Sequence, residues 1–263
     1  MKNYLSRAFK PLMPIIATAV GFTLIYVSAI PMPYEGQSIG GELLSWLLTL
    51  VAIALALFIV FNVEPKVFLE SNEFPLKRPE FKVIAGILLV APLFFLVQEY
   101  IVYGFASLSD NFQMDTLTFS AEELREDLIS SIHAVLLAPV LEELCFRQMA
   151  ISPFRRRGAR VVVCIVMALL FGMLHIRNFA GSAFGALAFG LVFIFSRNVW
   201  YSVALHAGSN LVATLLAIYC WLDIGEVEIS HLPVIMIPDI RVFIASSILA
   251  AFGIYLCFSR KGR

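Results

Sequence analysis

Hydrophobic residues are grouped along this chain into long blocks that contain almost no charged positions. The blocks run over residues 13–30, 43–61, 82–103, 129–152, 160–176, 179–195, 200–222 and 242–258. A helix needs roughly 20 apolar residues to cross about 30 Å of hydrocarbon. The pattern therefore predicts an all-α polytopic membrane protein, a bundle of eight transmembrane helices. The block 179–195 is at the lower length limit and follows a very short linker, so a re-entrant pair is the alternative there.

The positions of the basic residues predict the orientation of this bundle. If the N-terminus lies inside, the inner segments carry 15 of the 19 Lys and Arg residues. The outer segments carry only Arg125, Arg177 and Arg241, and Arg147 lies within a span. Lys and Arg accumulate in cytoplasmic loops. We therefore predict an even number of crossings with both termini cytoplasmic, and we interpret the Arg155–Arg157 cluster as a determinant of this topology.

Composition agrees with a membrane protein and narrows the choice of partners. Hydrophobic residues make up 60% of the chain and charged residues 14%, against about 25% charged in soluble domains. The net charge of zero gives no indication of a nucleic-acid partner. The four cysteines form no C-x-x-C pair, which disfavours a disulfide framework or a zinc knuckle. We predict a single integral membrane domain over residues 1–263, with its motif-bearing core at about 129–222.

Several ionisable side chains nevertheless fall inside the predicted spans. Each costs at least about 2.5–3.5 kcal/mol at the centre of a membrane helix, so such residues indicate function by default. Pro139 lies one turn before Glu142, the first of these residues. It cannot donate a backbone hydrogen bond, and the carbonyl that it frees needs a protein or water partner. The polar groups lie in the fourth, fifth and seventh blocks: Glu142, Glu143, Arg147, His175, His206 and Asn210. We expect them to meet in one buried, water-filled pocket.

The spacing of these residues indicates what they can do. Glu143 and Arg147 are four residues apart, so they share a helix face and can pair. Glu142 is turned by about 100° from its neighbour and is free for another role. His206 and Asn210, also four apart, direct two hydrogen-bond donors the same way. A buried carboxylate near a histidine can deprotonate water, and paired donors can stabilise an oxyanion. The pattern predicts amide hydrolysis, but spacing alone does not decide which glutamate is the base.

Three motifs in order also identify a family resemblance. They are E-E-x-x-x-R, F-x-x-x-H and H-x-x-x-N, formed by Glu142, Glu143, Arg147, Phe171, His175, His206 and Asn210. This combination resembles the CAAX protease and bacteriocin-processing family, also called CPBP or Abi proteins. The resemblance covers about residues 139–215, roughly a third of the chain. It implies an eight-helix intramembrane glutamic endopeptidase that works without metal or cofactor. Members of the family remove the last three residues from prenylated CAAX proteins.

The resemblance also implies a role for each motif residue. A glutamate, helped by the first histidine, would activate the water, while the second histidine and an asparagine would bind the oxyanion. In chain order these catalytic residues are Glu142, His175, His206 and Asn210. Supporting roles would fall to Glu143, Arg147 and Phe171. The expected partners are membrane lipid and a hydrophobic, prenylated or membrane-anchored peptide or protein, and the expected location is a prokaryotic plasma membrane.

Other functions remain open at this point. A zinc metalloprotease would use Glu142, His175 and His206 as ligands, although the chain has no H-E-x-x-H motif. A thiol protease would use Cys145 with His175 as its base. A transporter would use Glu142 and Glu143 as titrating sites. A non-enzymatic immunity or scaffold protein would use the buried ion pair for helix packing alone.

The remaining polar and small positions receive no catalytic role. His133 lies near the start of its block and is interpreted as interfacial. Gln98 and Glu99 lie near the outer end of the third block and stay unassigned. Gly181 and Gly185 form a G-x-x-x-G pair, which predicts a close helix contact.

Overall fold

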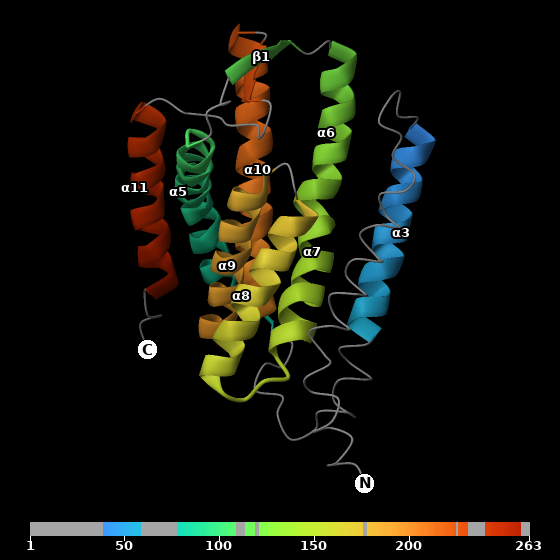
Figure 1. The fold of residues 1–263 in the computed structure, drawn as a ribbon, viewed down its shortest axis with the longest axis vertical. Coiled ribbons are helices and arrows are strands. Elements are labelled where there is room, and N and C mark those ends of the chain that lie inside the picture. The colour runs from blue at the N-terminus through green and yellow to red at the C-terminus, as the bar shows by residue number, and fades with distance from the viewer. Residues whose placement is uncertain are drawn as a thin grey trace.

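The described part of the chain is built from helices and one short β-ribbon (Figure 1). The structure is a computed structural model that describes residues 39–58, 78–108, 114–118, 121–175, 178–224, 226–230 and 240–258. The helices are α3 (Ile39–Phe58), α5 (Phe81–Ala106), α6 (Ala121–Leu136), α7 (Ala138–Glu143), the π-helix η3 (Leu144–Met149), α8 (Arg157–Leu174), α9 (Phe179–Ser196), α10 (Val199–Ile224) and α11 (Ile240–Phe258). The strands are β1 (Met114–Thr118) and β2 (Glu226–Ser230).

A short β-ribbon accompanies the all-α bundle that the sequence predicts. Strands β1 and β2 pair antiparallel, with Met114 opposite Ser230. One strand precedes α6 and the other follows α10, so both lie outside the apolar helices. Their Thr, Val and Ile residues favour extended backbone. Block hydropathy does not reveal this pairing, because the two segments are far apart in the sequence.

Helices long and apolar enough to cross a membrane account for most of the predicted blocks. Within the described residues there are six, which include the broken segment Leu128–Met149 and the continuous helix α9. The second predicted block forms α3, whose apolar part Trp46–Phe58 is shorter. The first block, 13–30, lies outside the described residues. The protein is thus an integral, multi-pass membrane protein.

Helix α10 occupies the middle of the bundle and packs against α5, α6 and α9. Helix α8 packs on α9, and α11 packs on α5, while α3 contacts α6, α7 and η3. Figure 1 shows α3 and α11 at opposite sides of the bundle. Large apolar side chains such as Leu47, Met173 and Phe252 are exposed, whereas Glu143, among other charged residues, is buried. Along the spanning helices, large apolar side chains thus face outward while Glu143 and Arg147 are buried, as a hydrocarbon environment requires.

Close helix contacts depend on glycine. A Cβ atom at Gly181 would lie 2.6 Å from Cγ2 of Val102 on α5. A Cβ atom at Gly185 would lie 3.3 Å from Oε1 of Gln98 on the same helix. The close contact predicted for the two glycines is therefore confirmed, and its partner is α5.

The predicted span 129–152 is broken near its middle. Helix α6 ends at Leu136, and Pro139 follows at the first turn of α7. In the break, the Ala134 carbonyl accepts a hydrogen bond from Nδ2 of Asn210 at 2.8 Å, so the side chain of a neighbouring helix supplies a backbone partner. The sequence suggested that His133 is interfacial. In the structure its Nε2 lies 2.8 Å from Oγ1 of Thr49, and this contact joins α6 to α3.

We predict that replacing Gly86 with alanine destabilises the bundle. The new Cβ would lie 2.5 Å from the backbone oxygen of Gly253 on α11, and overpacking of this kind costs about 1–3 kcal/mol. Gly104→Ala in the same helix is the control, because nothing lies within 4 Å of its Cβ position. At position 104, alanine is expected to raise the free energy of unfolding by up to about 1 kcal/mol, because its helix propensity is higher than that of glycine. Thermal unfolding in detergent measures both variants, and equal shifts in Tm would contradict the contact.

Candidate active site

A cavity of about 430 Å³ lies among α5, α6, α7, α8, α9 and α10. Its volume is within the range of about 300–1,000 Å³ that is usual for ligand sites. Among the residues that line it are Glu142, Phe171, His175, His206 and Asn210. The structure thus brings all three motifs together around one cavity, although they come from separate helices. Glu143 and Arg147 lie behind its wall.

The carboxylate of Glu143 is completely buried and has three partners. Nε of Arg147 lies 3.0 Å from Oε2, and the Ser202 hydroxyl donates to the same oxygen. Nδ1 of His206 lies 3.0 Å from Oε1. The pairing predicted for Glu143 and Arg147 is confirmed. An ionised carboxylate only accepts hydrogen bonds. Nδ1 of His206 must therefore carry a proton and donate it to Glu143.

Arg147 is 2% exposed and connects the π-helix η3 to α9. Its Nη2 donates to the Ala186 carbonyl at 3.0 Å. The guanidinium carbon lies 5.4 Å from the ring centre of Phe171 and 5.7 Å from that of Phe189, distances at which cation–π attraction acts. Single-turn π segments often occur at functional sites. Here the segment places the arginine one helical turn behind Glu143.

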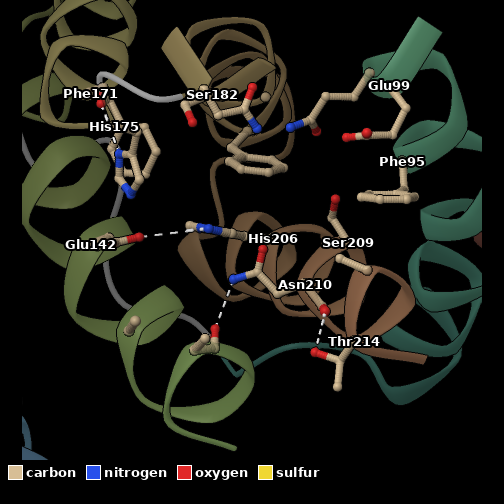
Figure 2. A pocket seen from close by; sticks show the side chains of 17 residues that line it. Phe95, Glu99, Glu142, Phe171, His175, Ser182, His206, Ser209, Asn210 and Thr214 are labelled. Atoms are coloured by element: carbon tan, nitrogen blue, oxygen red, sulfur yellow. Dashed lines mark hydrogen bonds and ion pairs between the residues drawn. The ribbon is translucent and has the colours of Figure 1, made fainter. Parts of the chain in front are cut away.

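Glu142 faces the cavity beside His206. Its Oε2 lies 3.6 Å from Nε2 of His206, which is longer than the usual N–H···O hydrogen bond of about 2.7–3.2 Å. Figure 2 shows the carboxylate directed toward the imidazole from the opposite wall. The imidazole stacks on Phe189 with ring centres 4.5 Å apart. The sequence left open which of the two adjacent glutamates is available for chemistry, and of this pair only Glu142 lines the cavity.

His175 lies at the end of α8 and is exposed toward the cavity. Its Nδ1 lies 2.9 Å from the Phe171 carbonyl. A carbonyl oxygen only accepts, so Nδ1 carries the proton and Nε2 is left as the acceptor. The ring stacks on that of Phe171 with centres 4.4 Å apart (Figure 2). Phe171 therefore positions His175 through both its ring and its backbone.

Asn210 lines the cavity one turn after His206. One N–H of its side-chain amide donates to the Ala134 carbonyl at 2.8 Å (Figure 2). The Thr214 hydroxyl donates to the Asn210 backbone carbonyl at 3.0 Å. An amide nitrogen carries two N–H groups, so the second remains for a ligand. The spacing that predicted a shared donor face did not show this link to the broken helix.

Other parts of the site were not assigned from sequence. Helix α5 adds Phe95, Gln98 and Glu99 to the cavity lining. Gln98 and Glu99 are two adjacent polar residues within an apolar block, and this signal could have placed α5 at the site. Phe189 and Ser202 hold His206 and Glu143. Neither carries a sequence signal, because Phe and Ser are ordinary residues in membrane helices.

Two alternative chemistries gain no support from the geometry. Cys145 is fully buried and is not among the residues that line the cavity, so its thiol is out of reach of a substrate there. Among the residues that the structure describes, no three His, Cys, Asp or Glu side chains form a group suited to a metal ion.

Comparison with known families gives an independent result. Residues 125–212 match a family model described as type II CAAX prenyl endopeptidase Rce1-like. The resemblance to CAAX proteases is confirmed. The matched range contains all seven motif residues and covers about a third of the chain. No curated protein and no solved structure gives a significant match.

We predict that Arg147→Met destabilises the protein strongly. Removing one partner of a buried ion pair leaves the Glu143 charge uncompensated and typically costs about 3–5 kcal/mol. Lys82→Met is the matched control, because its contact with Glu80, at 4.0 Å, is partly exposed and exposed pairs contribute about 0–1 kcal/mol. Unfolding in mixed detergent micelles measures both variants. A loss for Arg147→Met no larger than that of the control would contradict the assigned pairing.

Proposed function

We propose that the protein is an intramembrane endopeptidase of the glutamic type. It hydrolyses a peptide bond in a membrane-associated peptide or protein, using water activated by a glutamate and a histidine and without a metal ion. One observation carries this proposal: Glu142 faces the cavity, whereas both oxygens of Glu143 are occupied by partners. The first carboxylate is thus available as a base, and the second holds the site in place.

The first step of the proposed reaction is attack by water. The Glu142 carboxylate accepts a proton from the water, while Nε2 of His175, left as an acceptor by the bond at Nδ1, holds the same molecule. The resulting hydroxide attacks the carbonyl carbon of the substrate and forms a tetrahedral intermediate. General-base catalysis of this kind contributes about 10²–10⁴-fold to the rate.

The second step is stabilisation and collapse of the intermediate. The free N–H of Asn210 donates to the oxyanion, and Nε2–H of a doubly protonated His206 is the second donor. Glu143 fixes this imidazole through Nδ1, so the second donor is preorganised before substrate arrives. Glu142 then returns its proton to the leaving nitrogen as the C–N bond breaks. The products are a carboxylic acid and an amine.

The substrate class follows from the position of the cavity and from the family match. The cavity lies among membrane-spanning helices, so a substrate with an apolar anchor can reach it from the bilayer. The matched family is described as prenyl endopeptidases of CAAX type. We propose a farnesylated or otherwise membrane-anchored peptide as substrate, in a prokaryotic plasma membrane.

We predict that Glu142→Gln and His175→Ala abolish cleavage of a farnesylated peptide ending in a CAAX sequence. Each removes an acceptor for the attacking water, and a loss of about 10²–10⁴-fold is expected from the base alone. Asn210→Ala should lower kcat by about 10²–10³-fold, as for a lost oxyanion donor. Rates are measured with purified protein in detergent or liposomes.

The control for these variants is Cys145→Ala. This residue is buried three positions from the proposed base, outside the cavity lining, and its replacement should leave cleavage near the wild-type rate. Thermal unfolding confirms that each variant is folded. Full activity in folded Glu142→Gln would reject the proposal, and so would uptake of a solute into liposomes by a wild type that cleaves nothing.

We also predict that chelators leave activity unchanged. A mechanism based on carboxylate and imidazole groups needs no bound metal, so EDTA or 1,10-phenanthroline should not alter kcat/KM. The assay compares treated enzyme with the same enzyme after zinc is added back. Loss of activity on chelation that zinc restores would favour the metalloprotease instead.

A further inference from the structure

The cavity continues beyond the proposed catalytic residues to a second polar wall. This α5–α9 wall is formed by Gln98 and Glu99 from α5 and by Asn178 and Ser182 at the start of α9. Glu99 is only 4% exposed. Figure 2 shows Glu99 and Ser182 across the cavity from Glu142. The proposed hydrolysis uses none of these side chains, although polar groups in membrane helices are costly to retain.

Two acceptor atoms in this wall have no partner. Oε1 of Gln98 and Oδ1 of Asn178 are shielded from solvent and form no hydrogen bond within the described part of the chain. The Asn178 side chain caps no backbone N–H of α9, although the residue occupies the N-cap position. Buried acceptors are normally satisfied, so each exception calls for an explanation. Both residues line the cavity, so a rotation of either side-chain amide would turn its oxygen toward a ligand there, which can supply the missing donor.

Helix α9 provides the space for these amides. A Cβ atom at Gly181 would lie 2.5 Å from Oδ1 of Asn178, and one at Gly185 would lie 3.3 Å from Oε1 of Gln98. The glycine pair that brings α9 close to α5 therefore also leaves room for the two side-chain amides. A larger residue at either position would displace an acceptor from the wall.

The chemistry of the wall selects a ligand rich in donors. It holds the two amide oxygens without partners, and the hydroxyl of Ser182 lines the same side of the cavity. A peptide that leaves water for this cavity brings main-chain N–H groups that must find acceptors. We propose that the α5–α9 wall binds main-chain N–H groups of the substrate and so sets the register of the peptide against Glu142. This inference rests on the proposed function and adds the mode of substrate recognition.

The test uses the farnesylated peptide and a series of the same peptide with one amide nitrogen methylated at a time. Gln98→Met and Asn178→Leu remove an acceptor at nearly constant size. Each should raise KM by about 2–13-fold, the range for one hydrogen bond, with kcat unchanged. Asn178→Asp keeps an oxygen at the same position and should retain the wild-type KM. Methylation of the amide that meets Gln98 should weaken the wild type but not Gln98→Met.

The control is Ser247→Ala on α11, a polar side chain that bonds its own helix at the Phe243 carbonyl and does not line the cavity. Thermal unfolding shows that every variant is folded. The inference is overturned if Gln98→Met and Asn178→Leu keep the KM of the control, or if methylation weakens wild type and Gln98→Met equally.

A separate arm distinguishes failure of this inference from failure of the proposed function. Binding of the fluorescent farnesylated peptide to Glu142→Gln is followed by anisotropy, which needs no cleavage. Kd should rise by about 2–13-fold when Gln98→Met is added to this background. If the wild type cleaves nothing but Kd still rises in this way, the inferred role of the α5–α9 wall is supported and the proposed hydrolase function is rejected. An unchanged Kd, or no binding at all, overturns the inference that the α5–α9 wall binds the substrate.

Discussion

The carboxylate of Glu143 is the point on which the rest of the site depends. It lies in an apolar interior where an unpaired charge is costly, and three donors from two other segments satisfy it. Arg147 comes from η3, and Ser202 and His206 come from α10. The same contacts fix the orientation of His206. Because Glu143 is fully used in this way, the adjacent glutamate is the one left for chemistry.

The break in the fourth predicted span is a second place where a buried polar group is satisfied by a neighbouring helix. Pro139 interrupts the helix, and the side chain of Asn210 satisfies the Ala134 carbonyl at that place. One residue thus stabilises irregular backbone and lines the cavity. His175 is held in a similar way by the Phe171 carbonyl. Proposed catalytic groups are positioned by backbone as well as by side chains, which is how a rigid site is built.

Local signals account for what the sequence predicted. Apolar blocks located the helices, and the four-residue spacing identified the Glu143–Arg147 pair, since both depend only on nearby positions. The π-helix Leu144–Met149 and the role of Ser202 were not predicted, because each depends on which helix packs alongside. The pairing of β1 with β2 was missed for the same reason. Gln98 and Glu99 were visible as polar residues in a span, but only the fold shows that they reach the cavity.

The most direct measurement of the central claim compares the accessibility of the two adjacent glutamates. The protein in detergent is treated with dicyclohexylcarbodiimide, an apolar carboxyl reagent, and digested with trypsin. Mass spectrometry of the peptide that ends at Arg147 then locates the adduct. Our account predicts modification on Glu142, which faces the cavity, and protection of Glu143 by its three partners. Modification mainly on Glu143 would contradict it.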